Sequence, residues 1–218
     1  LSTVANPKLS VDLLWAEVIN SWNGGIALCC APKDIAGRLD ELMFSGNNSS
    51  IILTSATLCQ QGKTDEEKYS HQKLAIGFDG ECSSPQESPF PYDENSRLYI
   101  PEDIEPPNGS REKYINEVIE KIIELATITK GRTMVLFTAK SDMHEVHRKL
   151  YGKVPWQVIC QQDGSSQTTV IDEFKRTGGI LLGCGIFWEG INIPGPALSS
   201  VIITRLPFPV PDAIIEFK

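Results

Sequence analysis

The segment from residue 178 to residue 211 constrains the fold of this chain most strongly. It contains two short apolar runs, residues 180–184 and 201–204, which are bounded by turn residues and predict fully buried strands of a parallel sheet. The loop between them is rich in glycine, which lets a backbone approach a ligand closely. Ligands of open parallel sheets bind beyond the carboxyl ends of the strands, where this loop falls. The segment therefore predicts an α/β fold with a ligand-binding edge.

The part of the chain after residue 110 alternates between helical and strand patterns. Apolar spacing predicts helices over residues 111–129, from a cap at Ser141 to Gly152, and from a cap at Ser166 or a neighbouring residue to the Gly178-Gly179 pair. Short apolar runs predict strands over residues 133–137 and 156–160. Such alternation indicates a parallel sheet with right-handed crossovers and helices on its faces.

The part before residue 110 is less regular. Apolar runs at residues 11–19 and 26–30 flank Asn23-Gly24, a strong hairpin signal. Asp34 is expected to cap a helix that Gly46 ends and that carries four apolar residues on one face: Ile35, Leu39, Leu42 and Met43. Residues 50–58 predict a buried strand followed by a turn of small residues. The polar residues 59–107 predict a surface linker.

Several motifs resemble those of the DinG branch of the Rad3/XPD-like superfamily 2 DNA helicases. GIFWEGINIPG, with ALSSVIITRLPFPVP after it, is similar to motif V and its following strand. FTAKSDM resembles motif IV, and the Thr-Ser-Ala-Thr-Leu turn after an apolar run resembles motif III. The motifs keep the family's order over nearly the whole chain. The resemblance implies a RecA-like parallel sheet with helices on both faces, preceded by a hairpin, helix and strand from the first motor domain.

The resemblance also divides the chain into three parts. Residues 1–58 would end the first helicase domain, and residues 59–110 would link the two domains. Residues 111–218 would form the second RecA-like domain with motifs IV and V, ending before motif VI. The chain is thus expected to be a fragment of an ATP-dependent DNA helicase of DNA repair that moves 5′ to 3′ on single-stranded DNA.

Site residues follow from the matched motifs. The end of motif V, Glu189, Gly190 and Asn192, would face the nucleotide, although the family usually carries Asp where Asn192 stands. The motif III turn would couple nucleotide state to DNA grip through Thr54, Ser55, Ala56 and Thr57. The residues expected to contact single-stranded DNA are Thr138, Lys140, Gln161, Gly185, Trp188 and Arg205. Two alternatives stay open: Lys140 as a solvated lysine at a helix start, and Arg205 as the partner of Glu189 or another acid.

The sequence contains no G-x-x-x-x-G-K-[ST] phosphate loop and no acidic pair of the Walker B type. ATP and Mg²⁺ are therefore expected as cofactors of the full-length enzyme. This chain alone is expected to bind neither of them tightly and to be inactive. The six cysteines have neither CxxC pairs nor regular spacing. They predict reduced thiols of a cytoplasmic protein without an iron–sulfur cluster in this segment. His144 and His147 are three residues apart but have no further metal ligand nearby, which favours a structural role.

The expected partners are single-stranded DNA and the first motor domain of the same protein. A formal net charge of −8 argues for a local DNA groove rather than an overall positive field. Since no apolar run approaches the ~20 residues that span a bilayer, no membrane partner is expected. Two alternatives remain: a catalytically inactive nucleic-acid-binding or scaffold module on the same fold, and an unrelated α/β nucleotide or sugar-phosphate enzyme.

Overall fold

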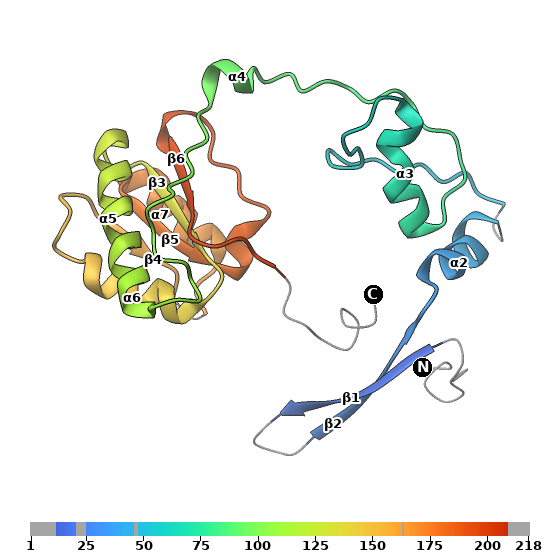
Figure 1. The fold of residues 1–218 in the computed structure, drawn as a ribbon, viewed down its shortest axis with the longest axis horizontal. Helices are drawn as coiled ribbons and strands as arrows, with labels where there is room; N and C mark the ends of the chain where they lie inside the picture. The colour runs from blue at the N-terminus through green and yellow to red at the C-terminus, as the bar shows by residue number, and fades with distance from the viewer. Residues whose placement is uncertain (1–11, 21–24, 46–47, 163, 209–218) are drawn as a thin grey trace. The chain divides into compact units, whose positions relative to one another are not determined.

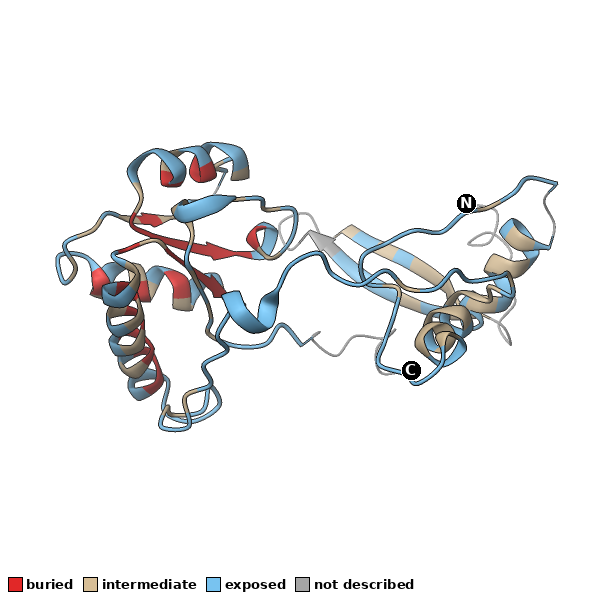
Figure 2. Cartoon of the chain, turned by 90° about the horizontal axis from the view of Figure 1, so that it is seen from above, coloured by how far each residue is buried: buried red, intermediate tan, exposed pale blue. Residues whose placement is uncertain are grey.

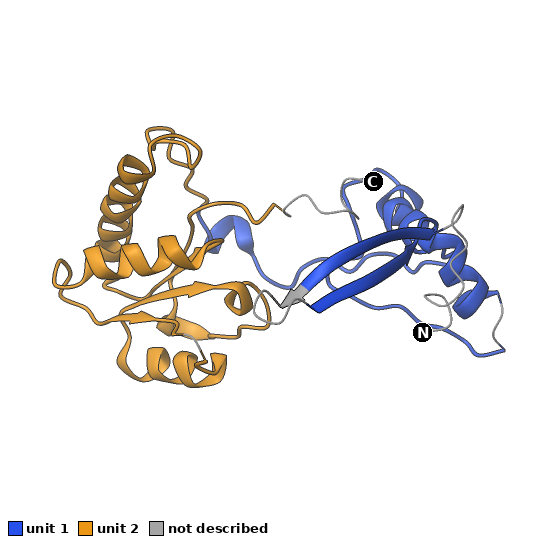
Figure 3. Ribbon diagram, turned by 90° about the horizontal axis from the view of Figure 1, so that it is seen from below, with its two compact units in different colours: residues 1–97, 209–218 blue, residues 98–208 orange. Residues whose placement is uncertain are grey.

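The computed structural model describes residues 12–20, 25–45, 48–162 and 164–208. The chain divides into two compact units, whose described parts lie within residues 12–97 and 98–208 (Figures 1 and 3). The units differ in packing, because every buried side chain among the described residues belongs to the second unit (Figure 2). Among the described residues, the well-packed hydrophobic cores therefore lie within residues 98–208.

The first unit begins with the predicted hairpin. Strand β1 (Asp12–Asn20) pairs antiparallel with β2 (Gly25–Pro32), and Trp15 lies opposite Cys29. The expected turn at Asn23-Gly24 lies outside the described residues. Ile26 and Leu28 on β2 are both more than half exposed. The described part of the first unit thus leaves these apolar side chains largely uncovered.

The helix after the hairpin starts where the sequence predicts. Helix α2 (Ile35–Leu39) continues as one π-helical stretch, η1 (Asp40–Phe44). The Asp34 carboxylate accepts a hydrogen bond from the Gly37 amide at 2.8 Å, so this residue is the expected amino-terminal cap. The expected stop at Gly46 lies outside the described residues. The apolar face is not buried, since Ile35, Leu42 and Met43 are all exposed.

The prediction of a buried strand at the start of residues 50–58 is wrong. These residues form no strand, and the side chain of Ile52 is 88% exposed. A strand needs a neighbouring strand to satisfy its backbone groups. The described residues offer none here, because β1 and β2 pair only with each other. The turn of small residues that follows is present at residues 56–57.

A helix follows this turn, within the residues 59–107 that were predicted to be a surface linker. Helix α3 (Asp65–Ile76) is capped by Thr64, whose hydroxyl accepts a hydrogen bond from the Glu67 amide at 3.2 Å. It ends at Gly77, which adopts φ +71°. Phe78 packs edge-to-face against Phe44, with ring centroids 5.2 Å apart. Residues 77–91 and 96–110 are irregular apart from turns, and the single helical turn α4 (Tyr92–Asn95) lies between them.

The second unit is the predicted α/β sheet. Its four strands are parallel in the order β4-β5-β3-β6, with no strand reversed. Its elements in chain order are α5 (Arg111–Thr129), β3 (Thr133–Phe137), α6 (Lys140–Leu150), β4 (Val158–Cys160), α7 (Gln167–Thr177), β5 (Ile180–Cys184), the 3₁₀ turns η2 (Gly185–Trp188) and η3 (Gly195–Ala197), and β6 (Ser200–Ile203). This is the expected RecA-like layout.

Helices cover both faces of the sheet (Figure 1). On one face, α5 and α6 bury residues such as Ile122 and Val146 against β3 and β5. On the other, α7 buries Phe174 beside Leu181 and the ring of Phe187. Because Phe174 is fully buried, its replacement by Ala is expected to cost about 3–5 kcal/mol of stability. The two cores fix the strands whose ends carry the candidate site.

Two details of this unit differ from the sequence prediction. Helix α6 starts two residues early, with Ala139 at the cap position and no side-chain cap bond, so Ser141 is not the cap. The strand predicted as fully buried at residues 201–204 is β6, an edge strand with alternating exposure. Its Val201 and Ile203 are about half exposed, at 50% and 49%. An edge strand has a neighbour on one side only, which its apolar sequence does not reveal.

Candidate nucleic-acid interface

Four segments follow the carboxyl ends of the four strands and meet at one edge of the sheet. They do so because all four strands are parallel. The segments are Thr138 to Lys140 after β3, residues 161–164 after β4, residues 185–192 after β5, and Arg205 to Phe208 after β6. Asp163, in the second segment, lies outside the described residues. The fold thus brings together all the predicted site residues of the second unit.

The segment after β3 presents a hydroxyl and a cation. Thr138 and Lys140 are both exposed, and Lys140 is the first residue of α6. Burial raises the pKa of the Cys184 thiol, and the nearby charge of Lys140 acts in the opposite direction. The charge of Lys140 thus acts on the thiol at the end of β5. The α6 amino terminus has no side-chain cap, and the first-turn amides of a helix favour anions.

The loop after β5 begins as a tightly packed 3₁₀ turn. Phe187 is 1% exposed and packs over Gly183, where an added Cβ would lie 2.7 Å from the Phe187 Cβ. The indole N–H of Trp188 donates a hydrogen bond to the Phe137 carbonyl at 3.0 Å. The Trp188 side chain is half-buried and packs against the α7-side core. Trp188 therefore ties the loop to β3, which leaves less of its ring available for stacking on a base.

The end of the same loop is open to solvent. Glu189, Gly190 and Asn192 are all exposed, and Gly190 adopts φ +69°, a conformation that favours glycine. The carboxylate and the amide are the two side chains of this stretch that can hydrogen-bond a ligand.

Two glutamines hold this loop by hydrogen bonds, one just after β4 and one at the start of α7. The Gln161 side-chain oxygen accepts a hydrogen bond from the Cys184 amide at 2.9 Å. The Gln167 side-chain nitrogen donates to the carbonyls of Ile186 and Glu189 at 2.6 Å and 3.1 Å. Gln167 was not among the predicted site residues, since nothing in the spacing of a polar residue at a helix start indicates a bond to a distant carbonyl.

The segment after β6 contributes Arg205, which is exposed. The preceding residue is fixed twice: the Thr204 hydroxyl donates to the Leu136 carbonyl at 3.0 Å, and the Thr204 carbonyl accepts from Tyr114. Burial raises the pKa of Tyr114, while its hydrogen bond with Thr204 and the charge of Arg205 act in the opposite direction. Among the described residues, no ion pair joins Arg205 to Glu189.

Comparisons with known proteins show the family of this chain. Residues 122–218 match the family described as helicase C-terminal domain. The chain is 30% identical over 92% of its length to the ATP-dependent helicase DinG of Mycobacterium tuberculosis, and 29% identical over 92% to the 3′-5′ exonuclease DinG of Bacillus subtilis. It is 32% identical over 78% of its length to the ATP-dependent DNA helicase YoaA of Haemophilus influenzae. This chain carries a helicase C-terminal domain of the DinG type. It spans 30%, 22% and 25%, respectively, of these relatives.

In this DinG-type chain, the motif III-like turn belongs to the first unit. Thr54, Ser55, Ala56 and Thr57 are all exposed. The Ser55 hydroxyl lies 3.3 Å from that of Thr57 and accepts a hydrogen bond from the Thr57 amide at 3.2 Å. The turn lines a hollow of about 550 Å³ with part of α3 and residues 81–86. In this hollow a hydrogen bond with Cys59 raises the pKa of Tyr69 to about 12.

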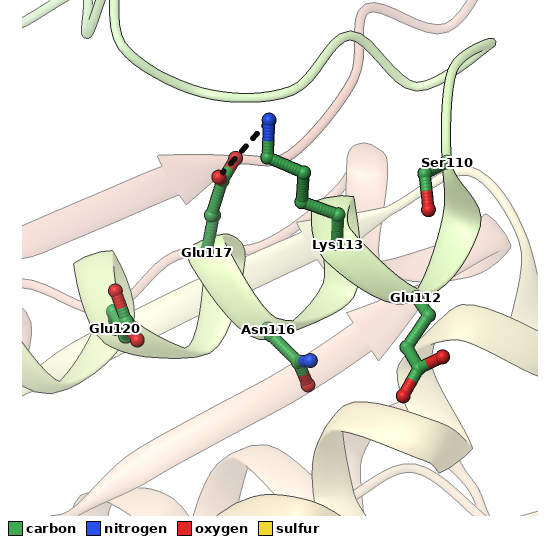
Figure 4. A pocket seen from close by; sticks show the side chains of 6 residues that line it. All are labelled: Ser110, Glu112, Lys113, Asn116, Glu117 and Glu120. Carbon is green, nitrogen blue, oxygen red and sulfur yellow. Dashed lines mark ion pairs between the residues drawn. The ribbon is translucent and has the colours of Figure 1, made fainter.

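A second hollow in this DinG-type chain does not suit phosphate. It has a volume of about 400 Å³ and lies on the exposed side of α5, where Figure 4 shows its lining residues: Ser110, Glu112, Lys113, Asn116, Glu117 and Glu120. Its one cation, Lys113, pairs with Glu117 at 3.9 Å and with Glu105 at 2.7 Å. Because its lining carries three carboxylates, this hollow repels anions.

The described residues contain neither a candidate metal centre nor a helix suited to cross a membrane. No group of three or more His, Cys, Asp or Glu side chains in them could hold a metal ion. The Nδ1 atom of His144 lies 3.9 Å from the sulfur of Cys160. No helix in the described part of the chain is both long and apolar enough to cross a membrane.

Proposed function

We propose that this chain provides single-stranded DNA contacts and one wall of the ATP cleft in a DinG-like helicase that moves 5′ to 3′. One observation carries the proposal: Thr138, Lys140, Gly185 and Arg205 are exposed together at the carboxyl edge of the sheet. A relative that matches 92% of this chain is named ATP-dependent helicase DinG. We further propose the division into a first-domain end at residues 1–58, a linker at 59–110 and a second motor domain at 111–218.

The chemistry of the edge supports contact with a nucleic-acid backbone rather than with base edges. Hydroxyl groups, backbone amides, a lysine and an arginine bind phosphates without reading sequence. Thr138 and Lys140 supply the first hydroxyl and cation, at a helix start that itself favours anions. The Gln161 oxygen is engaged by Cys184, so its contribution to DNA would come through its side-chain N–H groups.

The nucleotide side of the proposal rests on the end of the loop after β5. Glu189 and Asn192 are exposed on either side of Gly190, so their side chains can reach a nucleotide. An Asn amide can accept a hydrogen bond from a ribose hydroxyl as Asp does, without the charge. ATP supplies the chemical energy when bound. The phosphates and Mg²⁺ need a phosphate loop and acidic pair that this sequence lacks, so the chain forms only one wall.

We also propose that the Thr54–Thr57 turn couples nucleotide state to DNA grip. Each hydroxyl both donates and accepts, so the turn can exchange partners without a change in charge. Ser55 and Thr57 already share one such contact.

The direct test is fluorescence anisotropy with a labelled oligo(dT) at several salt concentrations. We expect weak binding whose logarithmic salt dependence has a slope of about −0.7 per phosphate neutralised. Lys140→Ala should weaken binding and flatten this slope. Lys153→Ala removes the same charge between α6 and β4, at the opposite edge of the sheet, and should bind as the wild type does. An equal loss of oligo(dT) affinity in both variants would contradict the proposal, as would tight binding that does not change with salt concentration.

A second test addresses hydrolysis. This chain alone should release no phosphate from ATP, with or without single-stranded DNA, because it has no phosphate loop. Turnover near 1 s⁻¹, within the ordinary range of enzymes, would mean that the proposed division of the ATP site is wrong.

A further inference from the structure

One side chain outside the predicted site spans the loop that follows β5. Gln167 is the first residue of α7, and its Nε2 atom lies 2.6 Å from the Ile186 carbonyl oxygen and 3.1 Å from that of Glu189. A side-chain amide nitrogen carries two hydrogens, so it can donate to both carbonyls at once. These carbonyls flank Phe187 and Trp188. A single side chain therefore bonds one carbonyl within the 3₁₀ turn and one just after it.

The two carbonyls lie at the end of the 3₁₀ turn, where a donor stabilises the path of the chain. Helical turns leave their last carbonyl groups without a partner inside the turn, and η2 ends at Trp188. The chain then turns away at Gly190, which adopts φ +69°. The Gln167 amide thus takes the place of the next turn of helix.

Gln167 is itself held in a fixed position. The Ser166 hydroxyl accepts a hydrogen bond from the Thr169 amide at 3.1 Å and caps α7. Val170, Ile171 and Phe174 anchor the same helix in the core. Because α7 is anchored, its first residue can define where the loop runs. Gln161 secures the start of the loop from the same side, through the Cys184 amide.

We propose that Gln167 is a positioning residue, which sets the backbone path from Gly185 to Asn192 and so aligns the loop for single-stranded DNA. Gln167 acts through the Ile186 and Glu189 carbonyls and does not contact the ligand. The proposal rests on the proposed function, because it assigns Gln167 to the loop that would meet DNA and nucleotide.

Two substitutions of the full chain test this role. Gln167→Met keeps the length and the neutral charge but removes both donors. Gln167→Glu also removes them and places a carboxylate against two carbonyl oxygens. Thr168→Glu is the matched control, since it adds the same charge at the next, exposed position of α7. The readouts are oligo(dT) affinity at pH 8 and amide hydrogen exchange in residues 185–192.

We expect both Gln167 variants to bind oligo(dT) about five- to tenfold more weakly, with faster exchange in residues 185–192 and unchanged exchange in α7. Thr168→Glu should stay close to wild type. Lowering the pH towards 5 should partly restore affinity in Gln167→Glu, because the protonated carboxyl group donates one hydrogen bond again. Gln167→Met should show no such recovery beyond that of the wild type. A purely structural role would not produce this difference in pH profile.

The outcomes separate this inference from the proposed function. Wild-type affinity and loop exchange in both Gln167 variants would overturn the inference, as would faster exchange throughout α7, which would indicate general loosening of the helix. If the wild-type chain does not bind oligo(dT), the proposed function fails and so does the DNA role of Gln167. Loop exchange then still decides whether Gln167 holds the loop.

Discussion

The Tyr114 hydroxyl donates a hydrogen bond to the Thr204 backbone carbonyl, 2.8 Å away, and thereby ties α5 to the residue just after β6. Tyr114 is 5% exposed and Thr204 is half-buried, so the bond is partly shielded from water. The same carbonyl belongs to the residue that precedes Arg205. A buried side chain of α5 thus holds the end of β6, next to a candidate DNA contact.

Removal of this hydroxyl is expected to destabilise the fold. Tyr114→Phe keeps the ring but leaves the Thr204 carbonyl without its donor, which should lower the free energy of unfolding by about 1–2 kcal/mol. Urea denaturation followed by circular dichroism measures the loss. Tyr151→Phe makes the same change at a side chain that is 78% exposed and should have no effect. Equal stability of Tyr114→Phe and the wild type would show that the bond contributes little.

The close contact of Gly183 with Phe187 predicts a specific coupling. Gly183→Ala would place its Cβ 2.7 Å from that of Phe187 and should cost about 1–3 kcal/mol through overpacking. In a Phe187→Ala background only part of this cost should vanish: the ring carbon Cγ, also 2.7 Å from the new Cβ, is removed, but alanine keeps the Cβ at position 187. Gly185→Ala is the comparison: it meets no atom within 4 Å, but φ +59° strains it. Its cost, about 1 kcal/mol, should not depend on Phe187. Thermal unfolding of the single and double variants measures the coupling.

The ion pairs of Glu145 with Arg111 on α5 and with Lys149 on its own helix, α6, predict a pH-dependent contribution to stability. Hydrogen bonds from Lys149 and Arg111 hold the Glu145 pKa below its usual value. A lowered folded-state pKa stabilises the fold above the unfolded-state pKa, and this contribution is lost as pH falls through the folded-state value. Glu145→Gln should therefore cost about 0.5–1 kcal/mol at pH 7 in low salt.

Urea denaturation of Glu145→Gln and the wild type across pH 7 to 3 tests this prediction. The two proteins should converge in stability as the pH falls below about 4.5. Glu120→Gln, at an exposed carboxylate of α5, serves as the control for loss of charge. A difference that persists unchanged at pH 3 would rule out the ion pairs as its source.

Thiol reactivity should distinguish the half-buried Cys160 from the exposed Cys82. Burial raises the pKa of the Cys160 thiol to about 11. At pH 8 only about one Cys160 in a thousand is then a thiolate, the form that reacts with iodoacetamide. Cys82 is exposed and should be modified much sooner, as peptide mass spectrometry can follow. Alkylation of Cys160 should accelerate as the pH approaches 11. Equal rates for the two cysteines at pH 8 in the folded chain would contradict this prediction.

Much of the second unit was predictable because its signals are local. The apolar spacing of α5 and the Ser166 cap of α7 depend on residues within a few positions of each other. The Thr64 cap and Gly77 stop of α3 are equally local. That helix was missed because none of its residues is buried, so its sequence lacks an apolar stripe. The apolar stripe that indicates a helix in a sequence is the face that packs on a core, and α3 has no such face.

The remaining differences depend on information that a local pattern does not contain. An apolar strand looks alike at the centre and at the edge of a sheet, so the half-exposure of Val201 was not predictable. The run around Ile52 looks like a strand but lacks a neighbour in the described residues. The candidate site follows the same rule. Strand order places Lys140 and Arg205 at one edge, as predicted, whereas the contacts of Gln167 depend on the fold of a loop far along the chain.

The position of β3 in the sheet has a consequence for how the domain forms. This strand is made early in the unit but pairs with β5 on one side and β6 on the other, both of which come later in the sequence. During synthesis, α5 and β3 therefore emerge with their apolar surfaces exposed until residue 203 has left the ribosome. Pairing between strands so distant in sequence slows folding and prolongs exposure to aggregation. A nascent chain stopped before β6 should be a good chaperone substrate, and one stopped after it a poor one.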